Sequence, residues 1–218
     1  MPLIIFAILL RTFLHTGLFI LAHDAMHLSL VPGRPDLNHQ LGRLALFLYA
    51  FLPYSHCLRK HKQHHDHSGH GSDPDYHDGS HHHPLLWYCR FMRQYVSPGQ
   101  LGLMGLGGGV ATLVLYVWAQ SSPLHLLVFW LLPLVLSSIQ LFYFGTYLPH
   151  REAAAPFYDH HRARSLHLPP IWSLLSCYHF SYHWEHHEYP QIPWYQLPQV
   201  YLSKVARIKV DQKAQQGS

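Results

Sequence analysis

The sequence predicts an all-α integral membrane protein with few transmembrane helices, some interfacial helices and a histidine-rich cap. Hydrophobic residues make up 49% of the 218 residues and charged residues only 12%, about half the charged share of a soluble domain. Histidine is the second observation, with 23 residues against 15 lysines and arginines. Long apolar runs alternate with histidine-rich polar stretches, so the histidines are expected to lie together outside the apolar layer.

Three apolar runs are long enough to cross a bilayer. Residues 3–22 are apolar except for Arg11, Thr12, His15 and Thr16. Residues 101–119 and 124–148 are separated by only four residues, which predicts a helical hairpin. A chain of this length has no soluble interior large enough to bury three such helices, so we interpret them as spans.

The apolar segment 44–54 is too short to cross. We expect an interfacial helix near 44–58, with Arg43 at one end and Arg59 and Lys60 at the other. It connects two histidine clusters that must share one side of the membrane if they share a metal site. The hairpin returns the chain to that side, which carries every basic residue except Arg11. This charge bias predicts that the clusters lie on the cytoplasmic side.

The remaining segments are predicted to be mostly loops. A short helix is expected at the start of 61–83, followed by a loop, and Pro169 and Pro170 must end any helix there. Residues 188–198 contain three prolines and predict an ordered irregular segment. The tail predicts a short amphipathic helix over 199–210 and a frayed end over 211–218. Glycines 107–109 favour close helix packing.

Three histidine clusters carry the chemistry: HDAMH (23–27), HKQHH (61–65) and HWEHH (183–187). Residues spaced by three or four lie on one face of a helix, so each cluster can present its imidazoles together. Imidazole is a good ligand for iron, zinc, copper and nickel. The eight histidines predicted as metal ligands are His23, His27, His61, His64, His65, His183, His186 and His187.

Eight imidazoles exceed what one tetrahedral zinc uses, and HDAMH lacks the glutamate of HExxH zinc proteases. The three cysteines have no CxxC spacing. Two metals with open positions fit the set, and iron is the metal that couples naturally to oxygen activation. A histidine-rich metal transporter is disfavoured because transporters place polar ligands within their spans, and a haem-binding subunit needs only axial pairs. The scattered basic residues indicate no nucleic-acid partner.

Two irons that each keep an open site favour a ninth ligand. His150 directly follows the last span and is the preferred candidate, with His179 as the alternative; a supporting role for either stays open. Carboxylates can fix imidazole tautomers, and the candidates are Asp24, Asp73, Asp75 and Glu185. Histidines expected to be non-ligands are His67, His70, His77, His81, His82, His83, His160, His161 and His167.

Aromatic residues gather around the third cluster. They can line a substrate channel or form an anchoring belt at the membrane interface, and both interpretations stay open. The candidates are Tyr178, Phe180, Tyr182, Trp184, Trp194 and Tyr195.

The chain resembles the membrane fatty-acid desaturases and hydroxylases with three histidine boxes. Five strings narrow the resemblance to the bacterial and cyanobacterial type of β-carotene ketolase: AHDAMH (22–27), LRKHKQHHDHSG (58–69), DPDYH (73–77), FGTYLPHR (144–151) and SLLSCYHFSYHWEHHEYPQIPWYQLP (173–198). The resemblance implies one desaturase-like domain over residues 1–218. Relatives usually begin with a further hydrophobic segment, so we expect a truncated N-terminus.

The resemblance implies oxygen insertion at C4 of a β-ionone ring, twice at one carbon, with loss of water to leave a ketone. β-Carotene would give echinenone and canthaxanthin; whether hydroxylated rings such as those of zeaxanthin react stays open. Two iron ions, O2 and external electrons from a ferredoxin-type donor are implied. The histidine spacing alone equally suits a carotenoid hydroxylase, a fatty-acid desaturase or an alkane hydroxylase.

Overall fold

The computed structural model describes the whole chain except residues 1, 78, 80–81, 153–156, 158 and 217–218. Over the described residues the chain forms helices and loops without a β-strand. Three helices are long and apolar enough to span a membrane: Pro2–Met26, Pro98–Ala119 and Pro123–His150. They contain the predicted ranges 3–22, 101–119 and 124–148. The all-helical class and the three span-length helices are therefore confirmed.

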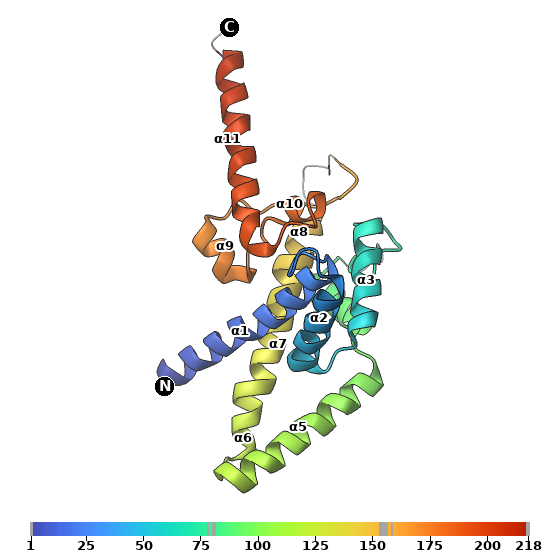
Figure 1. The fold of residues 1–218 in the computed structure, drawn as a ribbon, viewed down its shortest axis with the longest axis vertical. Helices are drawn as coiled ribbons and strands as arrows, with labels where there is room; N and C mark the ends of the chain where they lie inside the picture. Colours follow the sequence, from blue (N-terminus) through green and yellow to red (C-terminus); the bar gives the residue numbers. More distant parts are fainter. Residues whose placement is uncertain (1, 78, 80–81, 153–156, 158, 217–218) are drawn as a thin grey trace.

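The helices gather around the upper end of the long helix Pro123–His150, whose segments are labelled α6 to α8 in Figure 1. Its lower end forms a hairpin with α5, and α11 extends away from the body. The elements are α1 (Pro2–Met26), α2 (Pro35–Ala50), α3 (Tyr54–His67), α4 (Pro84–Tyr95), α5 (Pro98–Ala119), α6 (Pro123–Leu126), η1 (Leu127–Leu131), α7 (Leu132–Leu141), η2 (Phe142–Tyr147), α8 (Leu148–His150), α9 (Pro170–Cys177), α10 (His183–Glu188), η3 (Trp194–Gln196) and α11 (Leu197–Gln216).

Proline and serine set the ends of the hairpin. Both α5 and α6 begin with proline, which is tolerated in the first turn because that N–H has no helical partner. The hydroxyl of Ser97 accepts a hydrogen bond from the backbone N–H of Gln100 at 3.2 Å, and Ser122 does the same for Leu124 at 3.3 Å. Gln120 ends α5 in the left-handed conformation, with φ of 52°. The chain thus reverses within the predicted four residues.

The helix predicted near 44–58 is instead two helices. α2 ends at Ala50 and α3 begins at Tyr54. Between them Phe51 adopts a left-handed φ of 55° and Pro53 forms the N-terminal boundary of α3. Proline at this position disfavours a helical conformation in the residue before it. The apolar run 44–54 is therefore interrupted by a bend. The prediction of one continuous helix was therefore wrong.

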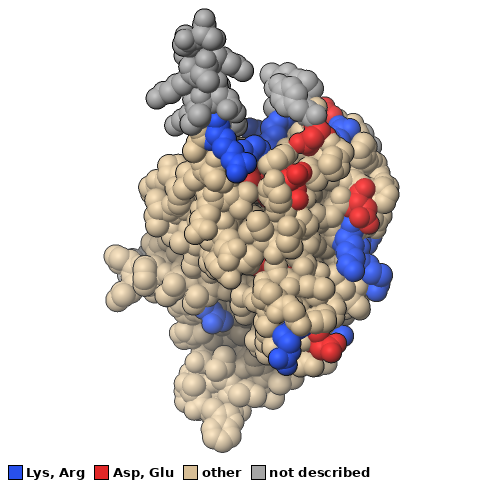
Figure 2. Space-filling model, turned by 45° about the horizontal axis from the view of Figure 1, so that its top comes forward, with Lys and Arg blue, Asp and Glu red and all other residues tan. Residues whose placement is uncertain are grey.

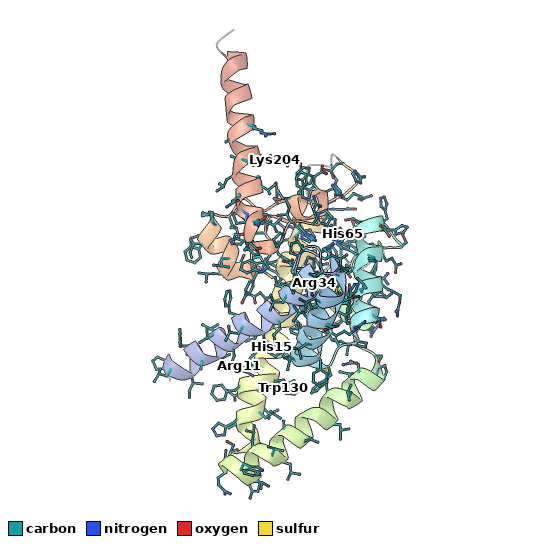
Figure 3. The ribbon with its side chains drawn as sticks, viewed as in Figure 1. Arg11, His15, Arg34, His65, Trp130 and Lys204 are labelled. Atoms are coloured by element: carbon teal, nitrogen blue, oxygen red, sulfur yellow. The ribbon has the colours of Figure 1, made fainter. Side chains whose placement is uncertain are left out.

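Pro133 of α7 provides a hydrogen-bond partner for Arg11, which lies inside the apolar helix α1. A proline has no N–H, so the carbonyl four residues earlier, that of Phe129, loses its helical donor. The Arg11 side chain of α1 donates its Nε–H to this carbonyl at 3.2 Å. The π-helical segment η1 lies over the same stretch, and Figure 3 shows Arg11 next to Trp130. Arg11 thus pairs with a backbone group that the sequence leaves open.

Two of the three consecutive glycines do bring α5 close to its neighbours. A Cβ at Gly107 would lie 2.6 Å from the Phe51 ring, and one at Gly108 would lie 3.1 Å from Trp130. A Cβ at Gly109 would meet nothing within 4 Å. The packing role predicted for the glycines holds at the first two positions.

Other segments differ from the sequence expectations in extent. Pro169 and Pro170 do stop any helix from passing through, but α9 begins at Pro170 and uses it in its first turn. The tail helix is longer than predicted, because α11 continues through Gln216 rather than fraying from 211. Residues 217–218 lie outside the described part. On the face shown in Figure 2, charged side chains lie mainly above the lowest part of the molecule, which shows none.

Candidate metal centre

Nine histidines converge in two groups. The first group contains five residues and the second contains four, and within each group the ring nitrogens lie within 4.8 Å of one another. All nine are buried or half-buried. The first group is His23, His27, His61, His65 and His186, and the second is His64, His150, His183 and His187. All eight histidines of the three motifs are included, together with His150.

Each HxxHH motif is divided between the two groups. In α3, His61 and His65 are four residues apart and both face the first group, whereas His64 faces the second. In α10 the division is reversed, because His183 and His187 face the second group and His186 the first. Side chains four apart lie above one another on a helix, and in both motifs it is the pair four apart that shares a group. Each HxxHH motif therefore contributes to both groups.

The closest ring nitrogens lie at separations expected of ligands that share one metal. Their Nε2–Nε2 distances are 2.6 Å between His27 and His61 and 2.9 Å between His150 and His183. The pairs His64–His187 and His65–His186 lie at 3.2 and 3.1 Å. Ligand nitrogens about 2.1 Å from one metal and at right angles to each other lie about 3 Å apart. The donor set therefore fits one cation in each group.

Burial keeps most of these rings neutral. It lowers the pKa of His61, His65, His183, His186 and His187 well below the usual value of 6.5, and the neighbouring histidines lower it further. For the same reasons the pKa of His27 falls to about 4. A neutral imidazole has a free lone pair and can bind a metal. The cluster is thus poised for ligation at neutral pH.

His64 is the exception among these imidazoles. Burial lowers its pKa, but the carboxylates of Asp73 and Asp75 outweigh burial and raise it to about 9. Its Nδ1–H donates to both oxygens of Asp73, at 2.9 and 3.0 Å. This contact fixes Nδ1 as the protonated nitrogen and turns Nε2 toward the second group. A metal there would replace only the proton on Nε2.

Two further ring nitrogens face away from the groups toward protein acceptors. The Nδ1–H of His150 donates to the carbonyl of Arg162 at 2.9 Å. Nδ1 of His23 lies 3.4 Å from Asp24, whose other oxygen accepts the backbone N–H of Trp194 at 3.0 Å. Such contacts orient the rings whose Nε2 atoms face the groups. The carbonyl of Arg162 has no sequence signature, because any residue supplies one.

The four predicted carboxylates do not play equal parts. Asp24 and Asp73 contact histidines of the groups directly. Asp75 lies 4.0 Å from Nδ1 of His64 and accepts the Tyr95 hydroxyl at 2.5 Å. Glu185 contacts no histidine of either group within the described structure, and its partners are Ser165 and Lys204. The side chain of Lys204 also lies over the Trp184 ring, 3.1 Å from its centroid. Glu185 therefore takes part in a contact between α10 and α11.

His150, rather than the alternative His179, lies with the eight motif histidines. His179 instead hydrogen-bonds Ser173 at 3.1 Å and stacks on Trp194. The histidines expected to be non-ligands belong to neither group wherever the structure describes them. His161 comes nearest, with its ring 5.8 Å from that of His187, and it pairs with Glu188 at 2.9 Å. His81 lies outside the described residues.

An apolar cavity of about 270 Å³ reaches the histidines. His23, His61, His64 and His183 lie in its wall, together with Phe180. The other predicted channel residues lie elsewhere. Tyr178 and Trp194 line a second hollow that touches none of the nine histidines.

Three aromatics contribute to the region around the C-terminal helix instead. Tyr182 is buried and stacks on Tyr201 of α11 at 4.4 Å. Trp184 hydrogen-bonds Asp159, and Tyr195 is 57% exposed. Proximity in sequence to the third motif therefore identified only Phe180 as a residue of the cavity.

Several cavity residues have no signal in the sequence. Tyr88, Phe91 and Tyr95 come from α4, a helix that the hydrophobic pattern did not predict. The last span does carry a regular stripe that the sequence shows. Its members follow one another at intervals of one or three residues: Leu131, Leu134, Val135, Ser138 and Leu141. Such spacing marks one helix face but not what that face encloses.

Comparisons with known proteins agree with this geometry. The fatty acid desaturase family matches residues 1–109 and 100–209. A β-carotene ketolase of Paracoccus sp. (strain N81106 / MBIC 01143) is 45% identical over 86% of this chain and 74% of its own length. A β-carotene 4-ketolase 3 of Haematococcus lacustris is 41% identical over 85% of this chain and 58% of its own. A zeaxanthin 4-ketolase of Chlamydomonas reinhardtii is 39% identical, with 85% and 41% covered.

No solved structure matches the chain. The family match extends over nearly the whole sequence, including the three histidine motifs and His150. The relatives above match most of this chain, and two of them are named for β-carotene. The chain therefore belongs to the fatty acid desaturase family, in the branch that contains the β-carotene ketolases.

Proposed function

We propose that this protein is a membrane carotenoid ketolase that converts the C4 methylene of a β-ionone ring to a ketone. One observation carries the proposal: two buried histidine groups lie at the inner end of an apolar cavity. The names of the relatives supply the substrate class. β-Carotene is the proposed substrate, with echinenone and canthaxanthin as products.

The nine histidines are the proposed ligands of two iron ions. Bound iron would supply the activation of O2, with external electrons from a ferredoxin-type donor. His27, His61 and the other neutral rings would offer their Nε2 lone pairs, and Asp73 would hold the Nδ1 proton of His64. The apolar wall would orient the ring and exclude water from the reacting carbon.

Asp24, Asp73 and Asp75 are proposed as groups that position ligands rather than bind metal. We propose no such part for Glu185, because its carboxylate is engaged by Ser165 and Lys204. The histidine side is proposed to face the cytoplasm, because lysine and arginine are enriched in loops on that side of a membrane. Arg11 is the one lysine or arginine inside a span-length helix, and the hairpin turn has none.

The direct test is expression in cells that accumulate β-carotene, followed by chromatography of the pigments. We expect echinenone and canthaxanthin in place of β-carotene. A matched variant, His61→Ala, should leave β-carotene unchanged. Zeaxanthin as the sole product would identify a hydroxylase, and unchanged pigment with altered fatty acids would identify a desaturase; either result contradicts the proposal. Purified protein that holds one zinc and no iron would contradict the metal assignment.

A further inference from the structure

The cavity extends far from the histidines. Its wall passes from Thr146 near His150 down the same helix to Val135 and Leu131. At 1.5 Å per helical residue, the 15 residues from Leu131 to Thr146 correspond to about 22 Å. The cavity is therefore elongated along the last span-length helix, with the metal centre at one end.

The exposed part of the wall lies on the side of the molecule and not at the histidine end. Three lining residues are classed among the exposed hydrophobic residues: Leu101 at 58%, Val135 at 43% and Leu131 at 39%. Leu101 belongs to α5, and the other two belong to Pro123–His150. At the inner end His64 and His183 are only 3% and 4% exposed. The opening thus lies between two helices that are apolar enough to contact lipid.

The two helices that carry these residues diverge above their hairpin. Figure 1 shows α5 leaning away from α7 above their shared hairpin. Gly107 brings α5 close to Phe51, and Gly108 brings it close to Trp130 and Leu126. Leu101 lies two turns before these glycines, on the part of α5 nearest α4.

Polar groups in the wall are paired with one another. The hydroxyls of Tyr88 and Ser138 lie 2.6 Å apart, and Tyr95 donates to Asp75. A paired hydroxyl has little remaining need for water or for a polar ligand. The part of the wall away from the histidines therefore suits a hydrocarbon.

We infer that a carotenoid end group enters this cavity sideways from the lipid, between α5 and α7, and that Leu101, Leu131 and Val135 form the portal. The inference rests on the proposed function and specifies the route to its site. The cavity volume of about 270 Å³ is slightly below the range of about 300–1,000 Å³ for sites that enclose a small ligand. One ring and part of the polyene occupy it, while the remainder of the substrate stays in the portal and the bilayer.

Neighbouring residues on the same helices provide matched controls. Leu131 lines the cavity, whereas Leu132 is 40% exposed and does not; Leu101 lines it, whereas Leu103 is 46% exposed and does not. We would purify Leu131→Trp, Leu101→Trp, Leu132→Trp and Leu103→Trp in lipid nanodiscs and measure iron content, folding and ketone formation. The two portal variants should lose about tenfold or more in kcat/KM with unchanged iron. The two controls should stay within about twofold.

A binding measurement separates the portal from the chemistry. β-Carotene would be added to metal-free protein in detergent, and the pigment that stays bound after gel filtration would be measured by its absorbance. Leu131→Trp should retain several-fold less β-carotene than Leu132→Trp. Equal retention, or equal ketone formation by portal and control variants of an active enzyme, would overturn the inference. Absence of any ketone from the wild type, with β-carotene retention lost selectively in Leu131→Trp, would instead refute the proposed function and leave the portal in place.

Discussion

Replacing Asp73 by asparagine tests whether a carboxylate outside the cluster controls one of the two metal positions. The Asp73 carboxylate accepts the Nδ1–H of His64 and the backbone N–H groups of Gly69 and Asp75, at 2.8 to 3.0 Å. Asparagine keeps one carbonyl oxygen for the loop but removes the charge opposite His64. Loss of such a partner costs about 10- to 100-fold in metal affinity, or about 1.4–2.7 kcal/mol.

The expected loss is confined to the second group, because His64 is its member and the first group has no contact with Asp73. Iron would be titrated against a competing chelator and counted per chain. Asp73→Asn should fall from about two irons to about one at a chelator concentration that leaves the wild type loaded. Asp66→Asn, an exposed change on α3, the helix that carries His64, should behave as the wild type. If Asp73→Asn retains both irons as tightly as the wild type, the positioning role of Asp73 is refuted.

Three further outcomes are expected. His150→Ala should lose iron from the second group, while His179→Ala should retain it, as judged by iron content per chain; equal loss in both would contradict the ninth-ligand assignment. The melting temperature of metal-free protein should fall as pH falls from 6.5 to about 4, because His27 and other rings with lowered pKa are neutral when folded and protonated when unfolded. His64 has the opposite sign, since its raised pKa stabilises the fold below 6.5 and that contribution is lost toward pH 9; because it is constant below pH 6.5, a melting temperature that does not fall between pH 6.5 and 4 would contradict the neutral state of the buried rings. Gly42→Ala should destabilise the fold by about 1–3 kcal/mol in chemical denaturation, because its Cβ would lie 2.3 Å from the Tyr54 ring, whereas Gly102→Ala should not.

Hydrophobic length and histidine spacing predicted much of this architecture. A run of apolar residues has one stable outcome in a chain of this size, so the three long helices could be recognised from composition. Spacings of three and four place imidazoles on one helix face whatever the tertiary structure, and all eight motif histidines do converge. His150 could be suggested by its place at the end of a span.

What the sequence left open depends on contacts between distant segments. The division of each HxxHH motif between two groups follows from how α3 and α10 face each other, which spacing alone does not specify. The cavity wall combines residues of α1, α4 and α7, and only packing brings Tyr88 opposite Ser138. The bend at Phe51 was missed because its left-handed conformation occurs in a residue type that rarely adopts one.

The contact between Arg11 and the Phe129 carbonyl has a consequence for the order of membrane insertion. An arginine at the centre of a lone membrane helix costs about 2.5–3.5 kcal/mol. The carbonyl that receives Arg11 belongs to a residue 118 positions later, so it does not exist while the first helix is being inserted. The contact between α1 and the last span-length helix therefore forms only after the hairpin has been synthesised, and it can offset the cost of Arg11 only from that stage on.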